Sequence, residues 1–246
     1  MAEHIAMMAP ESLKASVKPA HGPIFIIVPA YNESPVIQDT LMPLLSLGYS
    51  IVVVDDGSSD DTYEKICQLP VHVLRHPINL GQGAALQTGM TYALSQGASA
   101  IVHFDADGQH PPDRIRALLA PILSQNADIV LGSRFLEKRT SQAVPLHKRW
   151  VLKLGTLFTG LITNVWLSDT HNGLRALSRT AAQKLSISEP RMAHASEIIG
   201  LIGKHQLRYD EIPVQIHYTE YARRKGQPIW NALNIVIDIF LGRIFP

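Results

Sequence analysis

The residues in this sequence best suited to chemistry are two aspartates one residue apart, Asp105 and Asp107, followed by Gly108 and Gln109. They come directly after the uncharged apolar run 100–104, which is typical of a buried strand. Because ligands of open α/β sheets bind outside the carboxyl ends of the strands, both carboxylates would stand over a binding site. Such oxygen ligands suit Mg²⁺ or Mn²⁺, with Gln109 as a third ligand. Alternatively, the aspartates only cap the helix that follows.

Two other predicted strands, 24–28 and 51–54, are also followed by acidic residues. Glu33 follows the first strand, and Asp55 and Asp56 follow the second. Each could be ordinary turn or cap chemistry, but the carboxyl ends of parallel strands share one edge of a sheet. A nucleotide needs acceptors for its ribose hydroxyls and base N–H groups, which these three residues would supply, and its diphosphate needs a cation. The acidic clusters together therefore indicate one nucleotide-diphosphate site.

A pair of glycines, Gly81 and Gly83, lies at the start of a predicted helix over residues 82–95. With Asp105 at about the spacing of a ribose-binding acid, one interpretation is a dinucleotide-binding fingerprint. That fingerprint needs a third glycine where this chain has Leu86. We therefore favour glycines that let the backbone approach a ligand closely, or that only form a tight turn.

Apolar strands alternate with periodic helices through the first half of the chain. Such alternation predicts βαβ crossovers, and hence an α/β fold of Rossmann-like type with a mainly parallel central sheet. The predicted strands lie in 24–28, 51–54, 71–74, 100–104 and 128–134, and the predicted helices in 36–47, 60–69, 82–95 and 114–124. Later expected elements are an apolar helix over 150–166, a strand after residue 175, a helix near 196–204, one or two strands in 207–218 and a helix over 229–245.

Composition excludes several classes of protein. The net charge of +1 gives no global field for binding nucleic acid. The single cysteine, Cys67, excludes an internal disulfide and a cysteine-based zinc site, fits a reducing cytosol, and is expected to pack within the helix 60–69. Because no apolar run reaches about 18 residues and the N-terminal stretch carries charge, we expect neither a membrane span nor a signal peptide.

Five motifs occur in one order: Pro29-Ala30-Tyr31-Asn32-Glu33, Asp55-Asp56-Gly57-Ser58, Asn79-x-Gly81-x-Gly83, Asp105-Ala106-Asp107-Gly108-Gln109 and Gly132-Ser133-Arg134. Together they resemble the family 2 inverting glycosyltransferases with the A-type (GT-A) fold, and within them the dolichol-phosphate mannose synthases and polyprenyl-phosphate glycosyltransferases. The resemblance covers about residues 24–226. It implies a catalytic domain over 23–227, with a nucleotide-binding half to about 135 and an acceptor half from about 136. A loose tail (1–22) would precede it and an apolar, interfacial helix (228–246) would follow it.

The resemblance also implies a role for each matching position. Donor contacts fall on Pro29, Tyr31, Glu33, Asp55, Asp56 and Gly83, and the metal ligands are Asp105, Asp107 and Gln109. Arg134 would contact phosphate, Asp169 matches the acid before a Gly-Phe-Arg-like segment that ends in Arg175, and Arg223, Arg224 and Lys225 match a basic loop that closes over the donor. Two departures from the family are Leu174 in place of the usual aromatic residue and the lack of the C-terminal membrane spans of many relatives.

The implied reaction is a displacement at the anomeric carbon of a UDP- or GDP-linked sugar, with the nucleoside diphosphate as leaving group. A cation on Asp107, together with Arg134 and Arg224, would stabilise the charge that develops on that group. A polyprenyl (dolichyl or undecaprenyl) phosphate acceptor is largely dianionic at pH 7 and needs positioning rather than deprotonation. A saccharide or small-molecule hydroxyl would need a base, for which Asp169 and Glu197 are candidates. Glu197 equally suits a surface helix.

Arg139, Lys148 and Arg149 are candidates to receive the acceptor phosphate, although an ordinary solvated helix face explains them almost as well. The apolar helices 150–166 and 229–245 suit an interfacial position on the inner, cytosolic face of a membrane, or packing on each other or on a second subunit of a homo-oligomer. A non-catalytic nucleotide-sugar-binding protein is another alternative, and the intact acidic and basic positions argue against it. A nucleotidyltransferase is also conceivable on this architecture, but no glycine-rich, basic triphosphate loop follows the first predicted strand.

Overall fold

A continuous mixed β-sheet forms the centre of the protein, whose computed structural model describes residues 22–137, 155–157, 159–170, 172–189, 193–217 and 221. Within these residues the sheet has seven strands in the order β3-β2-β1-β4-β6-β5-β7. The strands are β1 (Ile24–Ala30), β2 (Ser50–Asp55), β3 (His72–Arg75), β4 (Ala100–His103), β5 (Ile129–Ser133), β6 (Arg175–Ser178) and β7 (Tyr209–Pro213). β6 runs antiparallel to both of its neighbours, and the other pairs are parallel.

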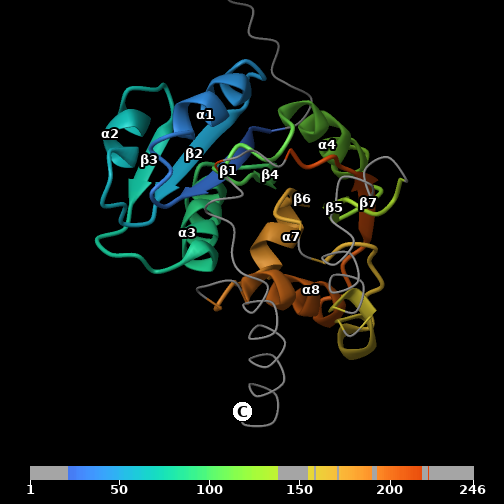
Figure 1. Cartoon of the computed structure of the whole chain (residues 1–246). Helices are drawn as coiled ribbons and strands as arrows, with labels where there is room; N and C mark the ends of the chain where they lie inside the picture. The colour runs from blue at the N-terminus through green and yellow to red at the C-terminus, as the bar shows by residue number, and fades with distance from the viewer. Residues whose placement is uncertain are drawn as a thin grey trace, which may run out of the picture.

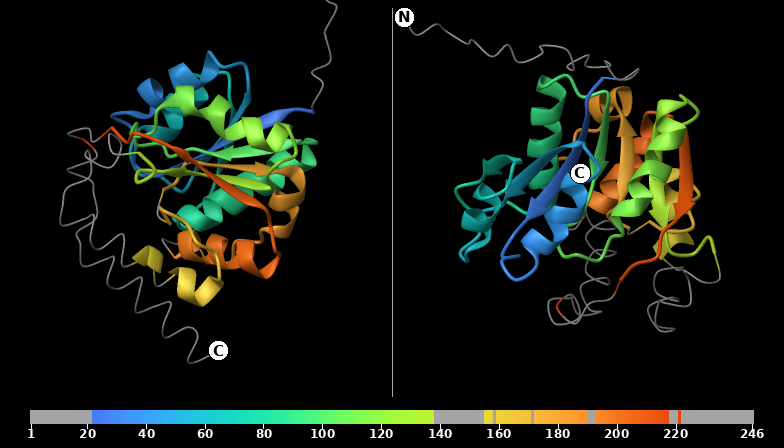
Figure 2. Two further views of the ribbon diagram at one scale, coloured as in Figure 1. Left: turned by 90° about the vertical axis from the view of Figure 1, so that its right-hand side faces the viewer. Right: turned by 90° about the horizontal axis from the view of Figure 1, so that it is seen from above.

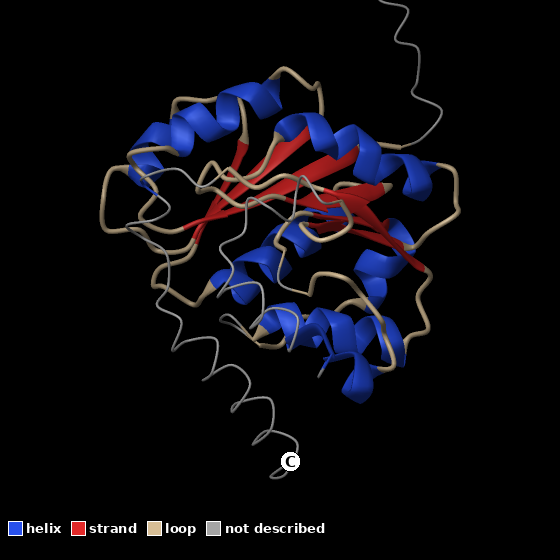
Figure 3. Ribbon diagram, turned by 45° about the vertical axis from the view of Figure 1, so that its right-hand side comes forward, coloured by secondary structure: helices blue, strands red, loops and turns tan. Residues whose placement is uncertain are grey.

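Helices cover both faces of this sheet (Figure 1 and Figure 3). The helices are α1 (Ile37–Leu45), α2 (Thr62–Cys67), α3 (Gln82–Ser95), a 3₁₀ turn (Pro112–Arg114), α4 (Ile115–Leu123), α7 (Arg179–Lys184) and α8 (His194–Lys204). The side chains of α1, α2 and α4 share one core with the sheet, and those of α3, α7 and α8 share the other. The left view of Figure 2 shows the sheet between these two layers.

Successive residues of the central strands enter opposite cores. In β1, Ile26 packs with the α1 side and Ile27 with the α3 side, and neither is exposed to solvent. A strand that is buried on both faces must be apolar at every position, which explains the unbroken apolar runs of β1, β2 and β4. The predicted α/β fold with a mainly parallel sheet is therefore confirmed.

The strand order switches direction at β1, beside the carboxyl ends of β2 and β4. The chain passes from β1 to β2 and β3 on one side, and then returns to β4 on the other side of β1. Open α/β sheets bind ligands at such a switch in strand order. The register aligns Ala30 with Asp55, and Ile27 with His103, so the acidic loops after the three strands lie at one edge, as the sequence predicted.

Several local predictions need correction. Cys67 does end a helix, but it is exposed rather than packed, because it follows the one buried residue of that turn, Ile66. The helix expected to reach residue 166 leaves the helical conformation at Asn164, whose φ of 56° is left-handed, so Trp166 lies beyond it. By contrast, α3 has the bounds that the sequence predicts.

Part of the sequence-based interpretation lies outside the described residues. This part comprises residues 1–21 of the expected tail, residues 228–246, which were expected to form a helix, and the basic residues Arg139, Lys148, Arg149, Arg223, Arg224 and Lys225. Among the helices that the structure does describe, none combines the length and the apolar character needed to cross a bilayer.

Candidate active site

The loop after β4 places the Asp-x-Asp motif in a small cavity at the carboxyl edge of the sheet. The cavity has a volume of about 80 Å³. It is lined by Asp105, Asp107, Gln109, His110, Arg134, Asn172, Gly173 and Ile216. The structure thus brings the three predicted metal ligands together with Arg134, which follows β5.

Hydrogen bonds fix the Asp105 carboxylate on both of its oxygens. Oδ1 accepts the side-chain amide of Gln82 at 2.8 Å, and Oδ2 accepts Nε2 of His110 at 2.8 Å. The carboxylate also packs on the backbone of Gly173, where an added Cβ would lie 2.7 Å from its Cγ. Burial opposes ionisation, but the hydrogen bond and charge of His110, with the charge of Arg175, outweigh it and lower the pKa of Asp105. Asp105 is therefore a fixed anion.

Asp107 has the opposite electrostatic environment. Burial and the charge of Asp105 raise the pKa of Asp107 to about 6. Its Oδ1 accepts the backbone amide of Gln109 at 3.0 Å. No group of three or more His, Cys, Asp or Glu side chains that could hold a metal occurs in the described part of the chain. An oxygen set of two carboxylates and the Gln109 amide fits Mg²⁺ or Mn²⁺ when the ligand's own phosphate oxygens complete the coordination.

Asp55, at the end of β2, is fully buried. Its carboxylate forms an ion pair with Nε of Arg75 at 3.0 Å and accepts the backbone amide of Ser58 at 3.3 Å. The same guanidinium lies over the ring of Tyr63, 4.2 Å from its centroid. These contacts close the turn after β2, and a direct contact between Asp55 and a nucleotide stays a prediction.

Asp56 holds the loop that leads into α3 through hydrogen bonds. Its Oδ1 lies 2.7 Å from Nδ1 of His76 and accepts the amide of Leu80 at 2.9 Å, while Oδ2 accepts the amide of Gly81 at 2.7 Å. Gly81 has a φ of 101°, which favours glycine. Asp56 therefore shapes the glycine loop, and its predicted nucleotide contact stays a prediction.

Glu33 joins the loop after β1 to a segment far along the chain. Its side chain is 8% exposed and accepts the hydroxyl of Tyr221 at 2.8 Å. The same hydroxyl donates to the carbonyl of Asn32 at 3.0 Å. Tyr31 lies at the surface with 41% of its area exposed. The start of the predicted basic loop is thus held against the predicted nucleotide motif.

Arg134 and Asp169 form a bidentate ion pair. Nε of Arg134 donates to Oδ2 at 2.6 Å, Nη2 donates to Oδ1 at 2.7 Å, and the backbone amide of Arg134 adds a third bond at 3.1 Å. Asp169 is 1% exposed, and its own amide is held by Glu211 on β7. Both carboxylate oxygens of Asp169, the candidate base, therefore accept hydrogen bonds from Arg134, the residue expected to contact the phosphate.

Pro29, Gly83, Arg175 and Glu197 are not among the residues that line the cavity. Pro29 is buried within β1, and Gly83 packs where an added Cβ would lie 2.9 Å from Cβ of His194. Arg175 is 2% exposed at the start of β6, and two of its guanidinium nitrogens have no partner among the described residues. Glu197 accepts the amides of the turn at residues 188–189. These placements indicate structural roles, and their substrate or catalytic roles stay predictions.

Sequence reasoning missed four polar residues of this region: Gln82, His110, Asn172 and Glu211. Gln82 and His110 hold Asp105, Asn172 lines the cavity, and Glu211 holds the backbone of the Asp169 segment. Gln82 and Asn172 lie inside or beside motifs that the sequence singled out, but their partners are distant. Only folding reveals the contact.

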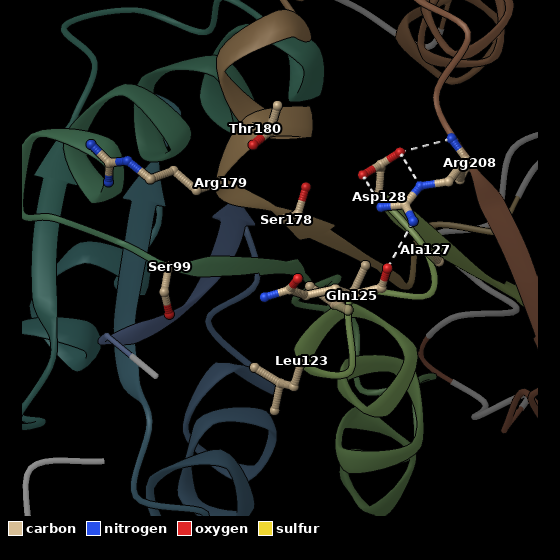
Figure 4. A pocket seen from close by; sticks show the side chains of 10 residues that line it. Ser99, Leu123, Gln125, Ala127, Asp128, Ser178, Arg179, Thr180 and Arg208 are labelled. Atoms are coloured by element: carbon tan, nitrogen blue, oxygen red, sulfur yellow. Dashed lines mark hydrogen bonds and ion pairs between the residues drawn. The ribbon is translucent and has the colours of Figure 1, made fainter. Parts of the chain in front are cut away.

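A larger cavity, of about 310 Å³, lies at the opposite edge of the sheet (Figure 4). It lies near Ser99 before β4, Asp128 before β5 and Ser178 at the end of β6. Its one lining carboxylate, Asp128, forms a bidentate pair with Arg208. This cavity therefore lacks the convergent acids of the carboxyl edge and is not the candidate active site.

Comparison with known proteins identifies the family. A model described as glycosyl transferase family 2 matches residues 25–186. The UDP-N-acetylglucosamine–dolichyl-phosphate N-acetylglucosaminyltransferase of Methanococcus voltae is 35% identical, over 89% of this chain and 95% of its own length. The polyprenol monophosphomannose synthase of Mycolicibacterium smegmatis is 31% identical, over 71% of this chain and 68% of its own.

Solved structures agree on the fold. Glucosyl-3-phosphoglycerate synthase of Mycobacterium tuberculosis, crystallised with Mn²⁺, UDP-glucose and phosphoglyceric acid, aligns with a TM-score of 0.64 at 20% identity. The alignment covers 92% of this chain and 80% of that one. The family model spans more than half of the sequence, and the fold is of the GT-A type. The chain therefore belongs to glycosyl transferase family 2 and is a glycosyltransferase.

Proposed function

We propose that this enzyme is a metal-dependent, inverting transferase that moves a sugar from a nucleoside-diphosphate donor to a polyprenyl phosphate at the cytosolic face of a membrane. The observation that carries the proposal is the bidentate pair of Arg134 and Asp169 beside the cavity of Asp105 and Asp107. The names of the relatives in M. voltae and M. smegmatis contain dolichyl phosphate and polyprenol monophosphomannose, which supports this acceptor class.

The donor diphosphate would occupy the cavity. When bound, a divalent cation on Asp105, Asp107 and Gln109 supplies Lewis-acid stabilisation of the leaving group. Arg134 adds a positive charge, and its ion pair with Asp169 already holds the guanidinium in place. The side chain therefore needs little reorganisation as negative charge develops on the leaving group. We assign the nucleotide to the neighbouring loops after β1 and β2, which carry the predicted donor contacts.

The acceptor must supply a nucleophile that is already deprotonated. A hydroxyl would have to lose a proton to a base, but both carboxylate oxygens of Asp169 already accept hydrogen bonds from the guanidinium of Arg134, so neither is directed at an acceptor. A phosphate monoester has a second pKa of about 6 and is largely dianionic at neutral pH. The ion pair therefore favours a phosphate acceptor over a saccharide hydroxyl.

An acceptor panel tests the proposal. The full chain is incubated with UDP- and GDP-linked sugars, and with short polyprenyl phosphates or the matching polyprenols, in the presence and absence of Mn²⁺ or Mg²⁺. We expect product on the phosphate only, dependent on the metal. Product on the polyprenol or on a saccharide, or transfer that persists in EDTA, would contradict the proposal.

The role of the ion pair can be isolated with matched variants. Asp169→Asn removes the anchor of Arg134 and should lower kcat by about 100-fold or more, as the loss of a preorganised charge does. Asp128→Asn makes the same change in the bidentate pair with Arg208 at the opposite edge. We expect this control to keep its activity, and an equal loss in both variants would show that the effect is structural.

The basic residues outside the described part of the chain complete the proposal. Arg139, Lys148 and Arg149 would receive the acceptor phosphate, so replacing them with glutamine should raise the acceptor KM and leave donor binding unchanged. Arg223 and Arg224, with the adjoining lysine, would contact the donor, so replacing them should weaken donor binding instead. The opposite assignment of the two effects would refute this division.

Exposed apolar side chains near residue 160 support a peripheral position on the membrane. Leu157, Leu161 and Trp166 are 52%, 69% and 55% exposed. The two leucines are four residues apart in a helical segment and thus share one face. Co-sedimentation with anionic liposomes should detect binding, and replacing both leucines with serine should weaken it. Failure of the unaltered protein to pellet would instead favour an interface between subunits.

A further inference from the structure

Gln82, the first residue of α3, reaches from the glycine loop to the predicted metal site. Its Nε2 donates to Oδ1 of Asp105 at 2.8 Å across 23 positions of sequence. We infer that Gln82 is a positioning residue, which orients the Asp105 carboxylate for a divalent cation and ties that carboxylate to the loop after β3. The inference rests on the proposed function, because it assumes that Asp105 binds the cation.

The backbone that carries Gln82 is itself held in place. The amides of Leu80 and Gly81, immediately before it, both donate to the carboxylate of Asp56 at the end of β2. Gly81 enters the helix with a φ of 101°, a conformation that side-chain-bearing residues rarely adopt. The side chain of Gln82 therefore extends from a backbone position that these contacts constrain.

The remaining sides of Asp105 are also constrained. His110 holds Oδ2 at 2.8 Å, and the backbone of Gly173 leaves no room for a Cβ beside the carboxyl group. The Asp105 side chain nevertheless keeps 26% of its area exposed and lines the cavity with Asp107. A ligand can therefore reach the carboxylate from the cavity, while its orientation is set by Gln82 and His110.

The chemistry of the donor suits this task. An ionised carboxylate has about four lone-pair sites, so an oxygen that accepts one amide hydrogen bond can still bind a cation. A neutral amide fixes the carboxylate without adding positive charge that would compete with the metal. Partners that hydrogen-bond to metal ligands typically account for about 10- to 100-fold in metal affinity. We expect Gln82 to contribute a factor in this range.

Gln82 also links two predicted subsites. Asp56 and the loop 76–81 belong to the predicted nucleotide region, and Asp105 belongs to the metal region. Because one side chain connects them, the affinity for metal and the affinity for nucleotide should be coupled through it, each ligand strengthening the other by the same factor.

The test measures Mn²⁺ binding directly rather than activity. The signal of free Mn²⁺ in electron paramagnetic resonance gives its Kd for the full chain, alone and with UDP or GDP. In Gln82→Met, which keeps the length of the side chain but removes the amide, we expect Kd with nucleotide to rise about 10- to 100-fold. We also expect Tm to stay unchanged. Gln96→Met makes the same change at the exposed far end of α3 and should bind Mn²⁺ normally.

A second variant separates the lost contact from a folding defect. Gln82→Asn keeps the amide but is one methylene too short to reach Asp105, so it should weaken Mn²⁺ binding as Gln82→Met does. Normal Mn²⁺ affinity in either variant with an unchanged Tm would overturn the inference, and so would weak binding that only accompanies a lower Tm. If the unaltered chain itself binds no Mn²⁺ with either nucleotide, the proposed function fails first.

Discussion

His103 provides a sharp test of the electrostatics behind the active site. It is the last residue of β4 and lies opposite Arg175 in the antiparallel pair with β6. The side chain is buried, and neither ring nitrogen has a hydrogen-bond partner among the described residues. Burial, and then the positive charges of Arg175 and His194, lower the pKa of His103 from 6.5 to about 3.

The sign of the effect on stability follows from proton binding. The unfolded chain binds a proton at His103 near pH 6.5, but the folded chain does so only near pH 3, so acid favours unfolding. Above pH 6.5 the histidine is neutral in both states and does not reduce the free energy of unfolding. As the pH falls below 6.5, the unfolded chain gains a proton that the folded chain does not, and the free energy of unfolding decreases. At about 1.36 kcal/mol for each pKa unit, His103 alone should lower the free energy of unfolding by about 2 kcal/mol between pH 7 and pH 5.

The assay is urea unfolding of the full chain at pH 7 and pH 5. Other groups titrate in this interval, so the informative quantity is the difference between proteins. In His103→Met the fall in the free energy of unfolding between the two pH values should be smaller by about 2 kcal/mol. His217→Met removes an exposed histidine and should leave the fall almost unchanged.

Since no hydrogen bond of the His103 ring is lost within the described residues, His103→Met should also be close to the unaltered protein in stability at pH 7. If the free energy of unfolding depends on pH in the same way in His103→Met and His217→Met, the prediction that His103 is neutral in the folded protein is refuted. A large loss of stability in His103→Met at pH 7 would mean that the ring makes a contact that this reasoning omits.

Three further substitutions probe the site itself. Gly173→Ala places a Cβ 2.7 Å from Cγ of Asp105 and should lower the transfer rate about 100-fold, since a displacement of about 1 Å has such effects. Arg134→Lys loses the planar fork and should lower kcat about 100-fold in steady-state assays, with a smaller change in donor KM. Tyr221→Phe removes the 2.8 Å hydrogen bond to Glu33 and should weaken nucleotide binding about tenfold by calorimetry.

Each of these substitutions has a control with the same chemical change elsewhere. Gly200→Ala adds a Cβ with no atom within 4 Å. Arg208→Lys alters a bidentate pair at the opposite edge of the sheet, and Tyr209→Phe removes a hydroxyl that contacts the backbone of Trp166. The reasoning fails for any pair in which the control loses as much activity or binding as the test variant.

The parts of the fold that were predictable are those that local sequence determines. The strands β1, β2 and β4 are buried on both faces, so their apolar runs were unbroken, and glycines at residues 81 and 97 bound α3. The antiparallel placement of β6 was not predictable, because strand order depends on contacts between residues far apart. The exposure of Cys67 was missed for a related reason. Ile66 is the apolar residue of that turn of α2 that packs in the core, and the next residue, Cys67, faces solvent.

The site shows the same division. The acidic residues were found because each lies at the end of a strand or in the loop that follows it, and strand order then brings these loops to one edge. The pairing of Arg134 with Asp169 was missed although each residue had been singled out, because 35 positions separate them. Gln82 lies within the glycine motif, but its own contact with Asp105 gave no signal, since a glutamine at a helix start is ordinarily a solvated residue.

His110 and the buried Arg175 together explain how two carboxylates can lie one residue apart without both losing their charge. Asp105 and Asp107 repel each other, and burial adds to the cost of ionising both. Against the effect of burial, the hydrogen bond and charge of His110 and then the charge of Arg175 lower the pKa of Asp105, while burial and the charge of Asp105 raise the pKa of Asp107 to about 6. One carboxylate is thus kept anionic by the protein, and the other gains most from an added cation. Arg175 is buried, does not line the cavity and acts through the ionisation of Asp105, which a family motif alone could not distinguish from direct contact with substrate.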